Sequence, residues 1–202
     1  MKILLAGGDS DVARYFKNSL DKESNLKIFC PGKRELDVSS RESIDRYFLS
    51  LPKIDCFINA AGSIHPMNIL DSSEERWLND INVNFISNYL ISKKVIKSNK
   101  KAKLIFISSA AAFNVYKNWS SYCISKQATV SLTKHLSKEG FNAYCVCPGG
   151  IETKFRKKIN INNLDMLSLK EVCDLLKDIV FSNKNYKSGD CILFKKNVLE
   201  IK

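Results

Sequence analysis

Short apolar runs recur along the whole chain, and a stretch with helical periodicity separates most of them from the next. The runs are apolar at nearly every position rather than at alternate ones, so strands built from them must be covered on both faces. Strands that alternate with helices form parallel sheets with helices packed on the two faces. The clear runs are residues 2–7, 26–30, 54–62, 103–112, 141–150 and 190–195, and a weaker run is 34–38.

This alternation predicts an α/β fold with a doubly wound parallel sheet of six to seven strands and helices on both faces. The helical stretches are residues 10–22, 39–51, 73–98, 120–139 and 168–182. No repeat or linker interrupts the pattern. We therefore expect residues 1–202 to form a single domain, which at this size buries a substantial core.

Composition restricts the compartment and the partners. Hydrophobic residues make up 45% and charged residues 26% of the chain, as in globular proteins that are not membrane-bound. No apolar run reaches the ~18 residues of a membrane span, and the apolar start is too short for a signal peptide. The seven cysteines lack metal-ligand spacing, so we expect reduced thiols, a cytoplasmic protein and no metal site.

Most of the net charge of +11 lies in the second half of the chain. One interpretation is a surface that binds nucleic acid. The other is a lysine-rich composition with solvated side chains, as in the stretch at 97–103. No stripe of aromatic and basic residues accompanies the charge, so we favour solvated lysines and expect no nucleic-acid partner.

Ligands of such sheets bind at the carboxyl ends of the strands, and four strand ends carry suggestive residues. A glycine-rich turn, AGGDSDVA at 6–13, leads into a helix whose N-terminus favours an anion. NAAG at 59–62, the serines at 108–109 and PGGIET at 148–153 follow later strands. Each pattern has a purely structural interpretation, because a tight turn also needs small residues.

The stretch YCISK at 122–126 places a tyrosine and a lysine on one helix face. An exposed amphipathic helix would account for that pair alone. A phenol titrates at about 10, and a nearby ammonium is expected to lower the pKa of Tyr122 so that it can transfer protons. Ser109 can hydrogen-bond a carbonyl oxygen on which negative charge develops.

Taken together, these motifs resemble those of the short-chain dehydrogenase/reductase family over nearly the whole chain. Ser109 lies 13 positions before Tyr122, as in the family, and NAAG, VNF at 83–85 and PGGIET match family motifs in order and spacing. The resemblance implies a compact, Rossmann-like, NAD(P)-dependent oxidoreductase. It also implies that Asn84 holds a water linking the lysine to solvent. The implied catalytic residues are Asn84, Ser109, Tyr122 and Lys126.

The expected cofactor is NADP, with NAD as the alternative. An acidic residue after the second strand would favour NAD, whereas here Lys33 and Arg34 follow that strand. Both cations could instead be solvated, with Glu35 in the acidic role. The predicted cofactor-binding residues are Gly7, Asp9, Ser10, Asp11, Val12, Lys33, Arg34, Asp37, Val38, Asn59, Ala60, Ala61, Gly62, Tyr122, Lys126, Pro148, Gly149, Ile151 and Thr153.

Departures from the family pattern leave a second function open. Asp11 and Ala13 replace later glycines of the phosphate turn, the helix between the second and third strands is missing, and the substrate-side segment is short. A non-catalytic NAD(P)-binding sensor or scaffold is therefore the alternative to an enzyme.

The substrate and the assembly are predicted from two further stretches. The cations after PGGIET lead us to expect an anionic small molecule, such as a nucleotide-linked sugar, an acyl-carrier-bound group or a carboxylate. The apolar face at 85–90 leads us to expect a homodimer or homotetramer, because the family often associates through it. The cations are Lys154, Arg156, Lys157 and Lys158.

Overall fold

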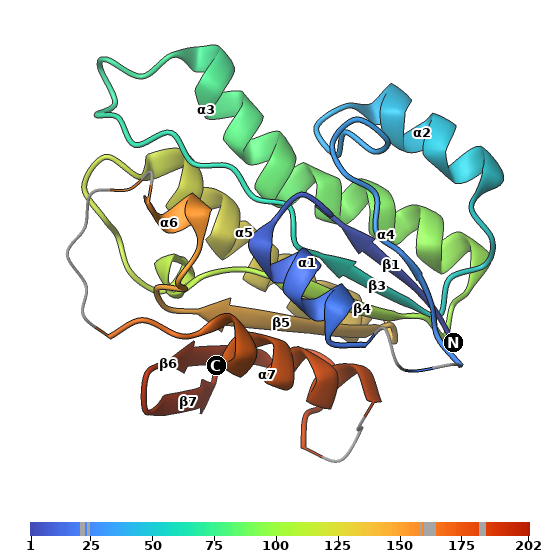
Figure 1. Cartoon of the computed structure of the whole chain (residues 1–202). Helices are drawn as coiled ribbons and strands as arrows, with labels where there is room; N and C mark the ends of the chain where they lie inside the picture. Colours follow the sequence, from blue (N-terminus) through green and yellow to red (C-terminus); the bar gives the residue numbers. More distant parts are fainter. Residues whose placement is uncertain (21–22, 24, 158, 160–164, 182–184) are drawn as a thin grey trace.

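The computed structural model describes residues 1–20, 23, 25–157, 159, 165–181 and 185–202. Its centre is a seven-stranded sheet with the order β2-β1-β3-β4-β5-β6-β7 (Figure 1). Neighbouring strands are parallel except β6 and β7, which are antiparallel. The strands are β1 (Lys2–Ala6), β2 (Lys27–Phe29), β3 (Cys56–Asn59), β4 (Lys103–Ile107), β5 (Asn142–Pro148), β6 (Cys191–Lys195) and β7 (Val198–Ile201).

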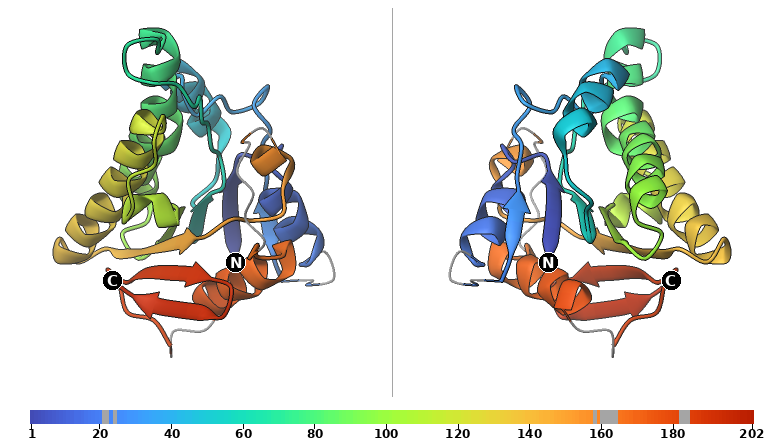
Figure 2. Two further views of the ribbon diagram at one scale, coloured as in Figure 1. Left: turned by 90° about the vertical axis from the view of Figure 1, so that its left-hand side faces the viewer. Right: turned by 90° about the vertical axis from the view of Figure 1, so that its right-hand side faces the viewer.

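Helices cover both faces of the sheet, as predicted (Figure 2). One core cluster joins the sheet to α2, α4 and α5, and the other joins it to α1 and α7. The helices are α1 (Asp11–Asn18), α2 (Arg41–Ser50), α3 (Glu74–Ile81), α4 (Ser87–Ser98), α5 (Ser120–Lys138), α6 (Lys154–Lys157) and α7 (Leu169–Phe181). No described helix is long and apolar enough to span a membrane.

Successive side chains of the central strands enter opposite cores. In β1, Leu4 packs into the α2–α4–α5 core, whereas Ile3 and Leu5 pack into the α1–α7 core, and all three are fully buried. Because strand side chains alternate between faces, a strand with two covered faces must be apolar throughout. This requirement explains why the unbroken apolar runs identified the sheet correctly.

The weak strand predicted at 34–38 is wrong. After β2 the chain turns at once, since the amides of Glu35 and Leu36 both donate to the carbonyl of Gly32. The amide of Asp37 donates to Ser43 Oγ at 2.9 Å, so these groups are not available to a neighbouring strand. Leu36 and Val38 are buried in the core, which accounts for their strand-like pattern.

Several elements were not predicted, including α6, β7 and a π-helical turn. The stretch Val198–Ile201 forms β7 through a hairpin after β6, with Asn197 at a φ of 60°. The single helix predicted over 73–98 is interrupted by a π-helical turn, Asn82–Ile86, between α3 and α4. That turn contains Asn84, a predicted catalytic residue, and π turns occur frequently at functional sites.

Candidate active site

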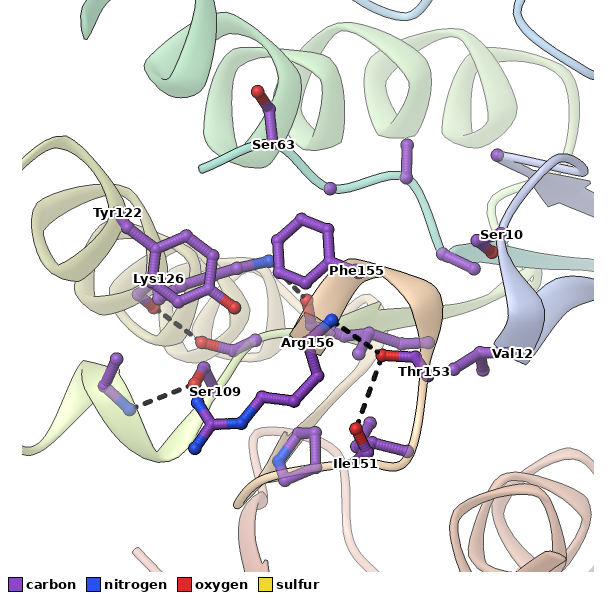
Figure 3. A pocket seen from close by; sticks show the side chains of 18 of the residues that line it. Ser10, Val12, Ser63, Ser109, Tyr122, Lys126, Ile151, Thr153, Phe155 and Arg156 are labelled. Atoms are coloured by element: carbon purple, nitrogen blue, oxygen red, sulfur yellow. Dashed lines mark hydrogen bonds between the residues drawn. The ribbon is translucent and has the colours of Figure 1, made fainter. Parts of the chain in front are cut away.

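A cavity of about 850 Å³ opens at the carboxyl ends of β1, β3, β4 and β5. Figure 3 shows Ser109, Tyr122 and Lys126 around it together with Phe155 and Arg156. Among the predicted site residues, Arg34, Asn59 and Asn84 do not line this cavity. Those that do are Gly7, Asp9, Ser10, Asp11, Val12, Lys33, Asp37, Val38, Ala60, Ala61, Gly62, Ser109, Tyr122, Lys126, Pro148, Gly149, Ile151 and Thr153.

The glycine-rich turn is held against the turn that follows β3. Gly7 has a φ of +79°, and a Cβ added to it would lie 2.4 Å from the backbone nitrogen of Ala61. Only glycine fits both the left-handed conformation and the close approach. Ser10 then caps α1 by accepting a hydrogen bond from Ala13 N at 3.2 Å. The first-turn N–H groups of α1, which have no partner within the helix, therefore lie beside the cavity.

Asp11, which stands at a glycine position of the family pattern, has a structural partner in this chain. Its Oδ2 accepts a hydrogen bond from the backbone nitrogen of Lys154 at 2.6 Å. A carboxylate in the first turn of a helix is also stabilised by the helix dipole. Asp11 thereby connects the start of α1 to the start of α6 across one end of the cavity.

Asn59 shapes the cavity wall from behind rather than facing the cavity. Its Nδ2 donates to Ser87 Oγ at 2.9 Å and to Asn88 Oδ1 at 2.7 Å. Its Oδ1 accepts from Ala61 N at 3.1 Å. The buried amide of Asn59 fixes the Ala60–Gly62 turn, and a contact of Asn59 itself with a cofactor stays a prediction.

Asn84 also contributes no surface to the cavity and instead contacts the backbone of Ser63, which does. Its Oδ1 accepts from Ser63 N at 3.0 Å, and its Nδ2 donates to Ser63 O at 2.7 Å. Its backbone carbonyl accepts from Asn88 Nδ2 at 2.9 Å and from Thr129 Oγ1 at 3.1 Å. The side chain thus holds the loop after the NAAG turn, while the carbonyl joins the π turn to α4 and α5.

Ser109, Tyr122 and Lys126 line the cavity on the side away from Ser10 and Val12 of the glycine-rich turn (Figure 3). Tyr122 and Lys126 come from one face of α5, and the Lys126 Nζ lies 5.3 Å from the centre of the Tyr122 ring. Lys126 Nζ donates to the carbonyl of Ile107 at 2.9 Å. Ser109 lies beside Tyr122 and acts to lower the pKa of its phenol.

Burial is the largest influence on the pKa values of Tyr122 and Lys126. It raises the pKa of Tyr122 to about 12, against the smaller effect of Ser109, which lowers it. It also lowers the pKa of Lys126 to about 8. We expected the lysine to lower the pKa of the phenol, and this expectation is wrong for the chain alone, because the cost of burying a charge outweighs the neighbouring charges.

An aromatic wall encloses Tyr122, and the motif pattern gave no indication of it. The Trp119 ring lies edge-on at 5.7 Å and the Phe155 ring at 6.3 Å between centroids. Phe155 comes from α6, and a Cβ on Gly62 would lie 3.9 Å from it. Phe155 lies two residues after PGGIET in the sequence, so it could have been placed near the cavity. Its contact with Tyr122 of α5 could not, because that contact depends on the fold.

The opposite end of the cavity carries charges of both signs. The backbone nitrogen of Lys33 donates to Asp9 Oδ2 at 2.7 Å, and its Nζ lies 3.7 Å from Asp37. The glycine-rich turn therefore fixes the backbone of Lys33 beside the cavity. Arg34 and Glu35 line a separate depression next to Gly8 and Cys30.

The family model for short chain dehydrogenases matches residues 4–164, and the chain belongs to that family. It is 34% identical over 128 residues to dehydrogenase/reductase SDR family member 6 of Rattus norvegicus, covering 59% of this chain and 52% of that protein. It is 29% identical over 138 residues to a 3-oxoacyl-acyl-carrier-protein reductase of Chlamydia trachomatis, covering 63% and 56%. The chain thus spans about half the length of these curated relatives.

Solved structures share the fold over almost their whole length. A 4-hydroxyisoleucine dehydrogenase complexed with NADH and succinate has a TM-score of 0.81 at 21% identity, covering 96% of this chain and 97% of that one. An actinorhodin polyketide ketoreductase with NADPH has a TM-score of 0.84 at 18% identity, covering 97% and 96%. The Rossmann-like fold inferred from the sequence is confirmed.

The buried lysine gives the first testable prediction. Unfolded, Lys126 titrates at 10.5, and folded at about 8, so the unfolded state binds more protons between these values. The free energy of unfolding should therefore rise with pH in this window, by roughly 2 kcal/mol between about pH 7.5 and 10. Urea unfolding of wild type and Lys126→Met measures this difference, which the variant should lose. Lys97→Met, at an exposed position of α4, is the control. Parallel curves for wild type and Lys126→Met would contradict the prediction.

Proposed function

We propose that the protein is an NADP-dependent oxidoreductase that reduces a carbonyl group of an anionic small molecule, with Tyr122 as the proton donor. One observation carries the proposal. Ser109, Tyr122 and Lys126 surround one end of a cavity whose other end is bordered by a phosphate-type turn and Lys33. A protein that only bound the cofactor would not need a buried tyrosine and a buried lysine beside each other at the far end.

The residues present fit a nicotinamide dinucleotide. The first-turn N–H groups of α1 suit a pyrophosphate, and the small residues at Ala60–Gly62 leave room for a ribose against the backbone. The absence of a side chain on Gly7 is what lets these two turns approach. When bound, such a cofactor supplies the hydride.

The chain's own residues supply position, charge and a proton. Burial keeps Tyr122 protonated, since its pKa of about 12 lies far above neutral pH, which is the state required to donate a proton to a reduced carbonyl. Ser109, which lines the cavity beside that phenol, is placed to bind the same carbonyl oxygen. Lys126 has a pKa of about 8 and can accept or release a proton close to physiological pH. The aromatic wall of Trp119 and Phe155 excludes water and strengthens these interactions.

Replacing the tyrosine tests the proton-donor role. Tyr122→Phe removes only the hydroxyl, so we expect turnover to fall by at least about a hundredfold while the dissociation constant of the reduced cofactor stays within about twofold. Lys126→Ala should impair both. Steady-state kinetics on a confirmed carbonyl substrate, with cofactor binding followed by fluorescence, measures the two effects. If Tyr122→Phe retains most of its activity, Tyr122 is not the donor. If wild type binds the cofactor and reduces no carbonyl compound, the sensor or scaffold alternative gains support.

The preference for NADP rests on Lys33. Its backbone is fixed to Asp9 and its ammonium is exposed at the cavity rim, where it can pair with a ribose 2′-phosphate. The acidic groups nearby, Asp9 and Asp37, already accept hydrogen bonds from backbone or serine groups. Arg34 borders another depression and is not part of this proposal.

The two adjacent cations form a matched pair for the next experiment. Lys33→Ala should raise the dissociation constant of NADPH about tenfold, because a charge-assisted pair with the phosphate is lost, and leave that of NADH unchanged. Arg34→Ala removes the same charge outside the cavity and should change neither. Fluorescence titration with both reduced cofactors decides the question. Tighter binding of NADH than NADPH by wild type would contradict the preference.

The anionic substrate is inferred from cations at the substrate side. Lys154 and Arg156 of α6 line the cavity together with Lys195 and Lys196 of the β6–β7 hairpin. A nucleotide-linked sugar, an acyl-carrier-bound group or a carboxylate would be attracted to this cluster. Lys158 lies outside the described residues, and so does the side chain of Lys157.

Salt dependence tests this inference. With cofactor saturating, kcat/KM should fall several-fold between about 0.05 and 0.5 M salt, because exposed charges are screened over that range. Lys154→Glu/Lys195→Glu should lower kcat/KM at low salt and flatten the dependence. The control is Lys97→Glu/Lys100→Glu, which makes the same charge change in the last turn of α4 and in the turn that follows it. An identical salt response in all three proteins would rule out attraction by the cluster.

We also propose a cytoplasmic homo-oligomer. All seven cysteines are free thiols, as expected in a reducing compartment. Tyr89 of α4 and Ile124 of α5 expose 45% and 49% of their surface, and a second copy packed on the α4–α5 surface would cover both. Leu90, which we expected on that surface, packs instead into the core between α4 and the sheet.

A further inference from the structure

Asp80 of α3 is a fully buried carboxylate that contributes no surface to the cavity. Four donors surround it within hydrogen-bond distance. Its Oδ1 is 2.7 Å from Ser63 Oγ and 2.8 Å from His65 Nδ1, and its Oδ2 is 3.0 Å from His65 N and 2.7 Å from Ser121 Oγ. Each oxygen therefore accepts two hydrogen bonds, an arrangement that fits a carboxylate, since an ionised Asp is an acceptor only.

These donors come from two segments that border the proposed active site. Ser63 lines the cavity directly after the NAAG turn, and Asn79 Nδ2, also at the cavity, lies 3.3 Å from its Oγ. Ser121 is the residue before Tyr122 in the first turn of α5. Asp80 thus joins the loop after β3 to the start of the helix that carries Tyr122 and Lys126. Because buried polar networks rigidify the groups they connect, this junction holds the two walls in register.

The charge of Asp80 also acts on both titrating groups of the site. It raises the pKa of Tyr122, in addition to the larger effect of burial, because a negative charge disfavours phenolate. It raises the pKa of Lys126, against burial, because it favours the ammonium. Arg156 opposes it at Tyr122 by lowering that pKa. The thiols of Cys145 and Cys147 on β5 act on Lys126 in the same direction as Asp80.

We propose that Asp80 is a positioning residue for the carbonyl reduction proposed above, on which this inference rests. It holds Ser121 and the Ser63–His65 loop so that Tyr122 meets the substrate in a fixed geometry, and its buried charge sets the balance between Tyr122 and Lys126. His65, with 40% of its side chain exposed, is the neighbour that connects this charge to solvent. Asp80 itself does not touch the reacting atoms.

Asp80→Asn is the informative variant. It keeps the size of the side chain, replaces one acceptor oxygen by a donor and removes the charge. We expect kcat/KM to fall roughly ten- to a hundredfold, as for a small misplacement of a catalytic group, with the cofactor dissociation constant unchanged. Glu75→Gln is the matched control, because it removes a carboxylate from an exposed position of the same helix and should leave activity at the wild-type level.

A pH measurement separates this role from a purely structural one. Without the Asp80 charge, the pKa values of Tyr122 and Lys126 both fall, so the pH profile of kcat/KM should move toward lower pH in Asp80→Asn. The Lys126 side chain, followed by NMR in the protein without substrate, should titrate below its wild-type value of about 8. Ser121→Ala breaks one contact and keeps the charge, so it should lower kcat/KM without moving that titration.

The outcomes are distinguishable. If wild type reduces no carbonyl compound, the proposed function fails, and the Lys126 titration still tests the electrostatic part. If wild type is active, but folded Asp80→Asn matches Glu75→Gln in kcat/KM and in the Lys126 titration, Asp80 is not a positioning residue. Should Asp80→Asn fail to fold, Ser121→Ala decides. In that case, a kcat/KM of Ser121→Ala within about twofold of that of the Glu75→Gln control would overturn the proposal.

Discussion

The whole cleft depends on the contact between the turns that follow β1 and β3. No side chain fits between Gly7 and Ala61, so the two strand ends approach until their backbones touch. This contact brings the N-terminus of α1 and the Ala60–Gly62 wall to the same side of the cavity. A methyl group at position 7 would collide with backbone rather than with a flexible side chain, and the sheet or the cavity would have to open.

Behind this contact, buried amides and hydroxyls replace ordinary apolar packing. Asn59 donates a hydrogen bond to Asn88, and Asn88 donates one to Thr129. Asn84 accepts one from the backbone of Ser63. These hydrogen bonds, whose partners are all within the protein, join β3, α4 and α5. Such groups are costly to bury without partners. Because each of these groups finds its hydrogen-bond partner in only one arrangement, the network fixes the positions of β3, α4 and α5. Apolar contacts alone would allow the helices to shift along the sheet.

Much of the fold could be predicted from the sequence because it follows from local patterns of residues. The two-faced sheet requires strands that are apolar throughout, and the shared helix face of Tyr122 and Lys126 follows from their spacing. The turn at 34–38 was misread because Leu36 and Val38 are buried without pairing, and sequence alone does not distinguish the two situations. In the sequence, Asp11 appeared only as a replacement for a glycine of the phosphate-binding turn. Its hydrogen-bond partner, the backbone of Lys154, lies 143 positions away, so this contact could not be predicted. The direction of the Tyr122 pKa shift was missed for the same reason, since it depends on how completely the fold excludes water.

The π turn at Asn82–Ile86 changes the rotational phase of the long helical segment that contains it. A residue added to one turn rotates everything after it by about 100° relative to an uninterrupted α-helix. The inward side of α3 can therefore place Asp80 against α5 and the Ser63–His65 loop, while α4 directs Ile91 and Val95 into the core beside the sheet. One covalent segment thus directs Asp80 toward α5 and directs Ile91 and Val95 toward the sheet, and a helix of constant period would place these side chains on a single side.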